Sequence, residues 1–420
     1  PGHQLPNANV IVNPNQHGCE FPSKSLAGVG VIFYVMSAVR AGLRKKQWFN
    51  DQRKEPNMAD FLDLVALGTV ADVVPLDKNN RILVEQGLRR IRVGKCSAGI
   101  RALIEVSGRS AAKLIASDMG FALGPRLNAA GRLDDISIGI ACLLTNDVAM
   151  AKDIATELDS MNQDRRQIEQ GMQVQAEAAL ARLEQDDSAE LPIGMCLFND
   201  EWHQGVVGIL ASRIKDLHQR PVICFALAND SEDCSELKGS ARSIKGFHIR
   251  DALDAVAAHN PGLIDKFGGH AMAAGLSLKK DKFADFSKAF DKEASRLLTE
   301  DDLQSCVMSD GALAPDEITI DNATLIHYAT PWGQLFPEPI FDNEFLVVQQ
   351  RIVGSKHLKL VLGMDDGTGQ IVDAIAFNID IKAWPDESIK RVRAAYRLDV
   401  NRFRGQETVQ LIIEHLEKVS

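Results

Sequence analysis

Apolar residues recur at helical spacing through the first part of the chain. This pattern predicts four helices there, over Leu26–Leu43, Asn57–Leu67, Asn79–Val93 and Ile100–Val106. The strongest periodic signal lies between Asp147 and Glu184, a stretch without proline. A helix of that length would be roughly 55 Å long. We therefore expect this helix to connect two domains.

The second half of the chain alternates strands with helices and then continues as strands alone. Between Ile193 and Leu298 the alternation predicts a compact α/β unit. Turn signals then separate five short runs, which are Phe345–Val353, His357–Gly363, Ile371–Phe377, Ala395–Asn401 and Thr408–His415. Five strands at this spacing favour a small OB-like barrel. The predicted fold is α/β and multidomain, divided into residues 1–146, 147–186, 187–300 and 305–420.

Composition and charge narrow the function classes. No run approaches the roughly 20 apolar residues of a membrane span, so we expect a cytoplasmic protein without a membrane partner. The seven cysteines are scattered and never form a CxxC pair, which argues against disulfides and structural zinc. The net charge of -10 argues against a surface that coats DNA, although a local basic groove remains compatible with it.

One carboxylate stands inside the apolar stretch VALGTVADVVPL, residues 65–76. This residue is Asp72. Burying an ionised carboxylate without a partner costs several kcal/mol or more. The pattern therefore predicts that Asp72 changes its protonation, pairs with a cation, or binds a metal ion.

Two arginines lie among small residues in FALGPRLNAAGRLDD, residues 121–135. We predict a turn at Gly124–Pro125 that displays Arg126 beside a backbone that a ligand can approach closely. Arg132 follows in the same stretch. The alternative is that both arginines are simply solvated in a loop.

The stretch LKGSARSIKG, residues 237–246, has the pattern of a strand. Alternation places Lys238, Ser240 and Arg242 on one face of this strand. A hydroxyl between two cations suits a phosphate, since arginine can bind two phosphate oxygens at once. An ordinary exposed strand would also carry these residue types, so that alternative stays open.

Two further stretches combine glycine with histidine. In KFGGHAMAAG, Gly268 and Gly269 are predicted to present consecutive N–H groups as an anion nest, with His270 as a hydrogen-bond donor. In EWHQGVVGILASR, His203 precedes a helix whose N-terminus is suited to a phosphate. A lone histidine is more often structural than functional. Together these stretches point to an anionic polymer that lies between two domains.

These stretches resemble the motifs of one known family. LVALGTVADVVPL, FALGPRLNAAGRLDD, EWHQGVVGILASRI, LKGSARSIKG and KFGGHAMAAGLSL are similar to motifs of the RecJ single-strand-specific exonucleases in the DHH phosphoesterase superfamily. PWGQLFPEPIFD, residues 331–342, resembles the start of their OB-type domain. The resemblance extends over essentially the whole chain.

The resemblance implies a 5′→3′ exonuclease that hydrolyses single-stranded DNA from a 5′ end. It implies the C-terminal part of a DHH domain, a long connecting helix, a DHH-associated domain with the GGH sequence, and an OB-like domain. A centre of two Mn²⁺ or Mg²⁺ ions is implied for the intact enzyme. Besides DNA, the implied partners are a helicase and a single-strand-binding protein, and the protein itself is expected to be a monomer.

The resemblance also implies roles for individual residues. Asp72 would be a metal ligand and a catalytic residue. The 5′-terminal phosphate would be held by Arg126, Ser240 and Arg242, and the phosphate near the scissile bond by Gly268, Gly269 and the catalytic His270. The barrel would guide the strand by stacking and by cations, and its basic residues are Arg391, Arg393, Arg397, Arg402 and Arg404. A solvated strand face would explain these arginines equally well.

The chain departs from the family at its start. It contains no DHH triplet, and Glu20 is the only acidic residue before Asp51. The triplet is expected just before Pro1, and Val10–Asn15 has the pattern of the end of an interior strand. We therefore expect a fragment with an incomplete metal site that is inactive alone. The alternatives are a single-stranded nucleic-acid-binding module without chemistry, or a phosphodiesterase for short oligonucleotides or cyclic dinucleotides. The OB-like domain argues against such small substrates.

Overall fold

The computed structural model describes residues 7–184, 191–228, 235–354, 356–364, 369–379, 383–403 and 405–419. The chain divides into two compact units. The first unit comprises Pro1–Pro125, Cys142–Lys152 and Val307–Ser420, and the second unit comprises Arg126–Ala141 and Asp153–Cys306. Among the described helices, none is long and apolar enough to cross a membrane.

The helices of the first unit begin and end close to the positions that the apolar spacing predicts. They are α1 (Gly28–Lys45), α2 (Leu62–Ala71), α3 (Lys78–Arg92) and α4 (Ala98–Val106). The side chain of Asp77 caps α3, because it accepts a hydrogen bond from the backbone N–H of Asn80 at 2.9 Å. The predicted strand end at Val10–Asn15 is wrong. These residues form coil and turn, and Val10 is exposed.

A run of short helices replaces the turn that we predicted at Gly124–Pro125. Helix α5 (Ala116–Asp118) continues into a π-helical segment (Met119–Leu123) and α6 (Gly124–Leu133), and α7 (Ser137–Leu144) follows. Proline is tolerated in the first turn of a helix, where its missing N–H would have no partner. A Cβ on Gly124 would lie 3.1 Å from the Met119 carbonyl oxygen and 3.3 Å from the Ala71 Cβ. The glycine therefore serves close packing.

The long helix is confirmed as α8 (Val148–Glu184), which has 37 residues. Its first turn, through Lys152, belongs to the first unit, and its remainder belongs to the second unit.

A five-stranded sheet forms the centre of the second unit. Its order is β1-β2-β3-β5-β4, with β1 (Met195–Phe198), β2 (Val222–Leu227), β3 (Glu236–Arg242), β4 (Lys266–Gly269) and β5 (Ala273–Lys279). Strands β1 and β2 are parallel, and the other neighbours are antiparallel. The pattern of LKGSARSIKG predicted β3 as a strand, whereas β4 lies in a stretch that we predicted as a nest.

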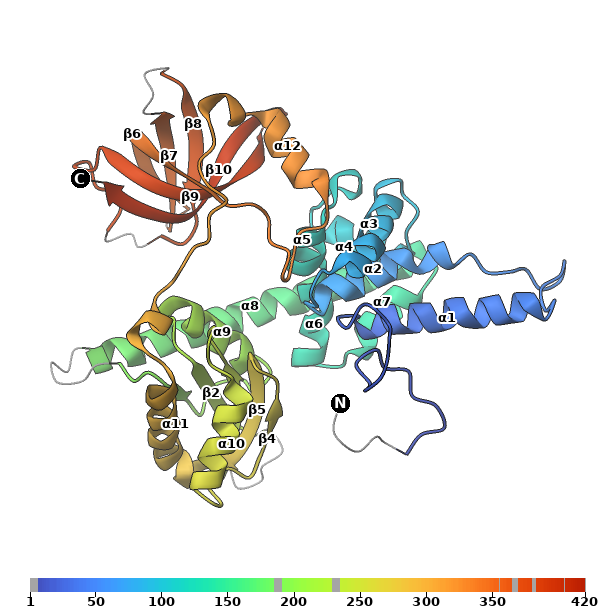
Figure 1. The fold of residues 1–420 in the computed structure, drawn as a ribbon, viewed down its shortest axis with the longest axis horizontal. Coiled ribbons are helices and arrows are strands. Elements are labelled where there is room, and N and C mark those ends of the chain that lie inside the picture. Colours follow the sequence, from blue (N-terminus) through green and yellow to red (C-terminus); the bar gives the residue numbers. More distant parts are fainter. Residues whose placement is uncertain are drawn as a thin grey trace. The chain divides into compact units, whose positions relative to one another are not determined.

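Helices cover both faces of this sheet (Figure 1). Val222 and Cys224 of β2 pack against α9 (Val207–His218) and the second half of α8. Ile223 and Phe225 lie in the opposite core with α10 (Ile249–His259) and α11 (Phe283–Leu297). This alternation is expected of a strand that is buried on both faces.

The C-terminal part of the first unit is the predicted barrel. Strands β6 (Phe341–Val353), β7 (His357–Met364), β8 (Ile371–Ala376), β9 (Arg391–Phe403) and β10 (Gln406–Val419) close in the order β10-β8-β7-β6-β9. Only β8 and β10 pair in parallel, as expected for an OB-like Greek-key barrel. Helix α12 (Ile320–Ala329) lies beside the barrel (Figure 1). Its Ala323 is part of the barrel core.

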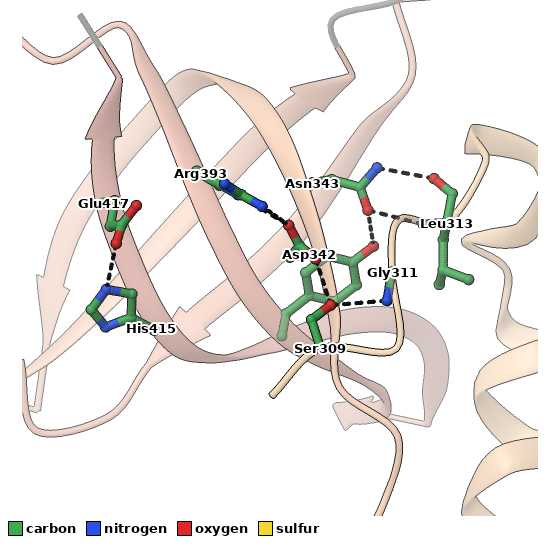
Figure 2. Close-up of polar contacts among 9 residues, drawn as sticks. Ser309, Gly311, Leu313, Asp342, Asn343, Arg393, His415 and Glu417 are labelled. Carbon is green, nitrogen blue, oxygen red and sulfur yellow. Dashed lines mark hydrogen bonds and ion pairs between the residues drawn. The ribbon is translucent and has the colours of Figure 1, made fainter. Parts of the chain in front are cut away.

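A polar cluster fastens the segment before the barrel to strands β6 and β9 (Figure 2). Asp342 accepts hydrogen bonds from Ser309 and Arg393, and these contacts lower the pKa of its carboxyl group. The Asn343 side chain accepts from the Leu313 backbone N–H at 3.1 Å and donates to the Leu313 carbonyl at 3.0 Å. The Asn343 side chain therefore makes hydrogen bonds to both backbone groups of Leu313, as a neighbouring strand would.

Candidate anion site in the second unit

Asp72 lies at the C-terminal cap of α2, and its side chain is exposed. Apolar residues before it in the sequence, among them Val65 and Ala66, are buried on α2, whereas Val73 directly after it is exposed. The expectation of a buried carboxylate is therefore wrong, and water solvates Asp72. In the described part of the chain, no group of three or more His, Cys, Asp or Glu side chains could hold one metal ion.

The two arginines of α6 have different surroundings in the second unit. Arg126 is buried, and its Nη2 lies 2.7 Å from Oδ1 of Asp159 on α8. Arg132 donates from Nη1 to the Gly205 carbonyl at 3.1 Å. One arginine is thus fixed by a carboxylate, whereas the other lies against the start of α9.

The segment before α9 is shaped around Arg132. The Gly205 N–H donates to Nδ1 of His203 at 3.1 Å. A Cβ on Gly205 would lie 2.3 Å from the Arg132 carbonyl oxygen, so only glycine fits there. Val206 caps α9 without a side-chain hydrogen bond, and the N–H groups of Val206 and Val207 donate to the His203 carbonyl at 2.9 and 3.3 Å, so the positive end of this 12-residue helix dipole lies beside Arg132 without a charged protein partner among the described residues. His203 therefore orders the helix start.

Ser240 and Arg242 lie under the same helix end. The register places them opposite Cys224 and Val222, on the sheet face that α9 covers. Arg242 donates from Nη1 to Ser240 Oγ at 3.0 Å and from Nε to Ser212 Oγ at 3.2 Å. A Cβ on Gly208 would lie 2.8 Å from both Arg242 Nη2 and Ser240 Oγ. The first turn of α9 therefore lies directly on these two side chains.

In the part of the chain that the structure describes, no ion pair neutralises the charges of Arg132 and Arg242. Burial lowers the pKa of Arg242, and the nearby positive charge of Arg132 lowers it further. Neither arginine has a carboxylate partner within the described ranges. A bound phosphate balances the charge of two neighbouring guanidinium groups and interacts favourably with a helix N-terminus. We call Arg132, Ser240, Arg242 and the first turn of α9 the anion site.

Lys238 shares the strand face with Ser240 but has a partner of its own. Its Nζ lies 2.5 Å from Oε1 of Glu236, two residues earlier on β3. Lys238 is thus not an unpaired cation of this site.

The predicted nest at GGH is wrong, because these residues form a β-hairpin. Gly268 pairs with Gly275 and Gly269 with Ala274, and the His270 N–H donates to the Ala273 carbonyl at 2.8 Å. Only Gly269 has a positive φ, of 149°. These N–H groups therefore do not converge on an anion.

The hairpin nevertheless leaves open surface beside the anion site. Gly275 pairs with both Gly268 and Ser240, so the three residues form a row across the sheet. A Cβ on Gly268 would meet nothing within 4 Å. Since neither packing nor φ requires glycine at this position, its small size leaves room above the strand. The His270 side chain is exposed at the end of this hairpin.

Arginines of the barrel have carboxylate partners. Arg391 pairs with Glu344, Arg393 with Asp342, Arg397 with Glu338 and Glu414, and Arg402 with Glu407. Arg404 lies outside the described residues. These pairs favour the alternative of an ordinary strand face over a cationic track.

Sequence reasoning missed Gly208 and Ser212. Both lie in EWHQGVVGILASR, where they are four residues apart and share one helix face. Small residues on that face, opposite a strand with Ser and Arg, are the signal that was available.

Comparisons with known proteins agree with this architecture. The DHHA1 domain model matches residues 192–296, and the RecJ OB domain model matches residues 309–415. The single-stranded-DNA-specific exonuclease RecJ of Dickeya dadantii (strain 3937) is 56% identical over 417 residues, which are 99% of this chain and 71% of that protein. The chain belongs to the RecJ family. RecJ of Escherichia coli (strain K12) is 55% identical over the same shares.

Solved structures of the RecJ family extend the likeness to three dimensions. RecJ from Thermus thermophilus in complex with Mn²⁺ has a TM-score of 0.78 at 29% identity, covering 100% of this chain and 57% of that chain. Its complex with Mg²⁺ has a TM-score of 0.74 at 28% identity, covering 96% and 57%. The Thermus thermophilus protein thus binds these divalent cations, and this chain covers 57% of its length and 71% of the length of the two exonucleases named above.

Proposed function

We propose that this chain binds the 5′ end of single-stranded DNA for a 5′→3′ exonuclease of the RecJ type. Arg132, Ser240 and Arg242, together with the N-terminus of α9, bind the terminal phosphate. The row of Gly275 and Gly268 gives the next part of the backbone room to approach the sheet. His270 lies at the end of this row, where it donates to the following phosphate.

One observation carries the proposal. Arg242 is half-buried beside Arg132, and its partial burial together with the positive charge of Arg132 lowers its pKa, while no described carboxylate balances the two arginines. A structural pair would be expected to bring an acid, as Arg126 does with Asp159. We therefore assign Arg126 a positioning role, in which it fixes α6 on α8, and assign phosphate contact to Arg132.

Binding of matched oligonucleotides tests this function. A single strand with a 5′-phosphate is expected to bind this chain about tenfold or more tightly than the same strand with a 5′-hydroxyl, since one added charge-assisted contact contributes about 1.5–3 kcal/mol. Fluorescence anisotropy measures both affinities. A 3′-phosphorylated strand is the control for added charge. Equal affinity for the 5′- and 3′-phosphorylated strands would reject recognition of the 5′ end.

The metal centre of the relatives does not fit the described residues. Asp72 offers one exposed carboxylate of the oxygen type that Mg²⁺ and Mn²⁺ prefer, but no described cluster completes a site around it. We propose that Asp72 supplies one carboxylate ligand of that centre. One ligand alone does not define a hydrolytic step. A helicase and a single-strand-binding protein stay proposed partners of the activity.

Calorimetry with MnCl₂ checks this interpretation of Asp72. We expect no Mn²⁺ site with a Kd below about 1 μM, because one monodentate carboxylate cannot replace the several oxygen ligands of such an ion. Asp72→Asn should weaken the remaining binding further, because it removes that carboxylate. Sub-micromolar binding that Asp72→Asn abolishes would show that Asp72 belongs to a complete site.

A further inference from the structure

A second cationic surface lies in the first unit, at the end of α1 and in the loop that follows it. We define the α1 tip as residues Arg44–Glu55 (α1 is labelled in Figure 1). This segment carries Arg44, Lys45, Lys46, Arg53 and Lys54 against Asp51 and Glu55, in a chain whose net charge is -10. The positive charge is therefore concentrated locally.

The carboxylate of Glu55 is already engaged. It accepts hydrogen bonds from Nε of Arg44, 3.0 Å from each carboxylate oxygen, and lies 3.6 Å from Nε of Arg40. The hydrogen bond to Arg44 lowers the pKa of Glu55. This ion pair ties the end of the loop back to α1, and it leaves the other cations of the α1 tip to solvent.

Lys45, Lys46, Arg53 and Lys54 are exposed. Within the described ranges, none of the four has a carboxylate partner. An unbalanced group of exposed cations attracts phosphates. What distinguishes this group from ordinary solvated lysines is the aromatic side chain at its centre.

Trp48 is half exposed, and Arg53 lies over its ring with Cζ 4.3 Å from the centroid. The arrangement is ordered by backbone contacts. Gln47 follows the end of α1 with a φ of 53°, and the Trp48 N–H donates to the Leu43 carbonyl at 3.0 Å. The tip thus presents an indole ring that is held in place by the helix end.

Asn50 fixes Arg53 above that ring. Its Oδ1 accepts from the N–H groups of Gln52 and Arg53, both at 3.0 Å, and the backbones of Asn50 and Arg53 form a bridge. Although Arg53 stacks on the indole, Trp48 keeps 49% of its surface exposed, so a base can reach the ring. An indole with a stacked guanidinium among free lysines is a combination that binds single-stranded nucleic acid, because bases stack on the ring while the cations contact phosphates.

We propose that the α1 tip is a second, sequence-tolerant binding site for single-stranded nucleic acid, in which Trp48 stacks on a base and Lys45, Lys46 and Lys54 contact the backbone. This site requires no strand end. It goes beyond the proposed recognition of the 5′-phosphate, and neither site's test depends on the other.

The test uses an oligothymidylate of about twenty nucleotides with a 5′-hydroxyl end, so that the anion site contributes no end recognition. Trp48→Ala should weaken binding of this strand to the whole chain by about tenfold, the size of one lost stacking contact. Trp48→Phe should restore most of the affinity, since phenylalanine also stacks. Quenching of indole fluorescence gives a second readout, because Trp202 and Trp384 are buried and Trp48 is the most exposed tryptophan of the described residues.

Charge variants separate this site from nonspecific attraction. The double variant Lys45→Gln with Lys46→Gln should reduce the slope of log K against log salt concentration by about 1.4, because two phosphate contacts to a single strand are lost. Lys288→Gln with Lys292→Gln is the control, since these two exposed lysines of α11 have no carboxylate partner in the described ranges. The proposal is overturned if the two lysine pairs have equal effects, or if Trp48→Ala and Trp48→Phe do not differ. It is also overturned if the chain prefers a polyglutamate peptide to the oligonucleotide. Unchanged 5′-phosphate preference in the Trp48 variants would show that the anion site is intact.

Discussion

Arg242→Ala should remove most of the preference of this chain for a 5′-phosphorylated strand. A guanidinium contact to a phosphate contributes about 1.5–3 kcal/mol, so the affinity for that strand should fall by about 10- to 100-fold. The affinity for a 5′-hydroxyl strand should change little, because that strand lacks the group that Arg242 contacts. Anisotropy titrations with the two strands measure the difference.

The same variant should not lose stability. Burial and the neighbouring charge of Arg132 lower the pKa of Arg242, which means that the protein surroundings disfavour its charged form. Removing the side chain relieves this unfavourable interaction but also removes its hydrogen bonds to Ser212, Ser240 and the Ala241 carbonyl, so the midpoint of thermal unfolding should change little. A merely structural arginine would behave in the opposite way, with lost stability and equal weakening of both strands. That result would reject the binding role.

A matched arginine on the other side of the sheet supplies the control. Arg296 of α11 is exposed and donates to both carboxylate oxygens of Glu293, at 3.0 and 2.7 Å. Arg296→Ala removes the same charge without touching the anion site. We expect it to weaken both strands slightly and equally, since only the net charge changes.

The periodicity of apolar residues predicted helices and strands well where one face of a long segment packs against a core. Helix α8 and the five barrel strands follow directly from apolar spacing, because a repeat over many residues outweighs local exceptions. Gly124–Pro125 misled us for a local reason. Glycine and proline are typical of turns, but proline also suits the first turn of a helix, and the reason for Gly124 is a contact with Ala71, 53 positions earlier in the chain.

The residue types of the candidate site were predictable, whereas their partners were not. Strand alternation correctly placed Ser240 and Arg242 on one face. Nothing in the sequence separates Arg126 from Arg132, because the distinction depends on Asp159 from another helix. The exposure of Asp72 was likewise hidden, since a strongly apolar stretch can end where its helix reaches the surface.

Gly87→Ala should destabilise the first unit strongly, because α2 and α3 cross at this glycine. A Cβ there would lie 2.2 Å from the Leu62 carbonyl oxygen and 2.5 Å from the Ala66 Cβ. Backbone atoms cannot rotate away as a side chain does, so the helices must separate. Overpacking of this kind costs about 1–3 kcal/mol, and occasionally more.

Gly42→Ala is the matched control for this substitution. Gly42 also lies in a helix of the first unit, but a Cβ there would meet nothing within 4 Å. Alanine favours a helix over glycine by up to about 1 kcal/mol, so this variant should be as stable as the wild type or more stable. The free energies of unfolding of the two variants, measured by chemical denaturation with circular dichroism, should therefore change in opposite directions relative to the wild type. Stabilisation by both substitutions would contradict the close crossing of α2 and α3. Since Asp72 caps the C-terminus of α2, the Gly87 variant should also displace the carboxylate that we assign to the metal centre, which links the packing of this helix pair to the proposed chemistry.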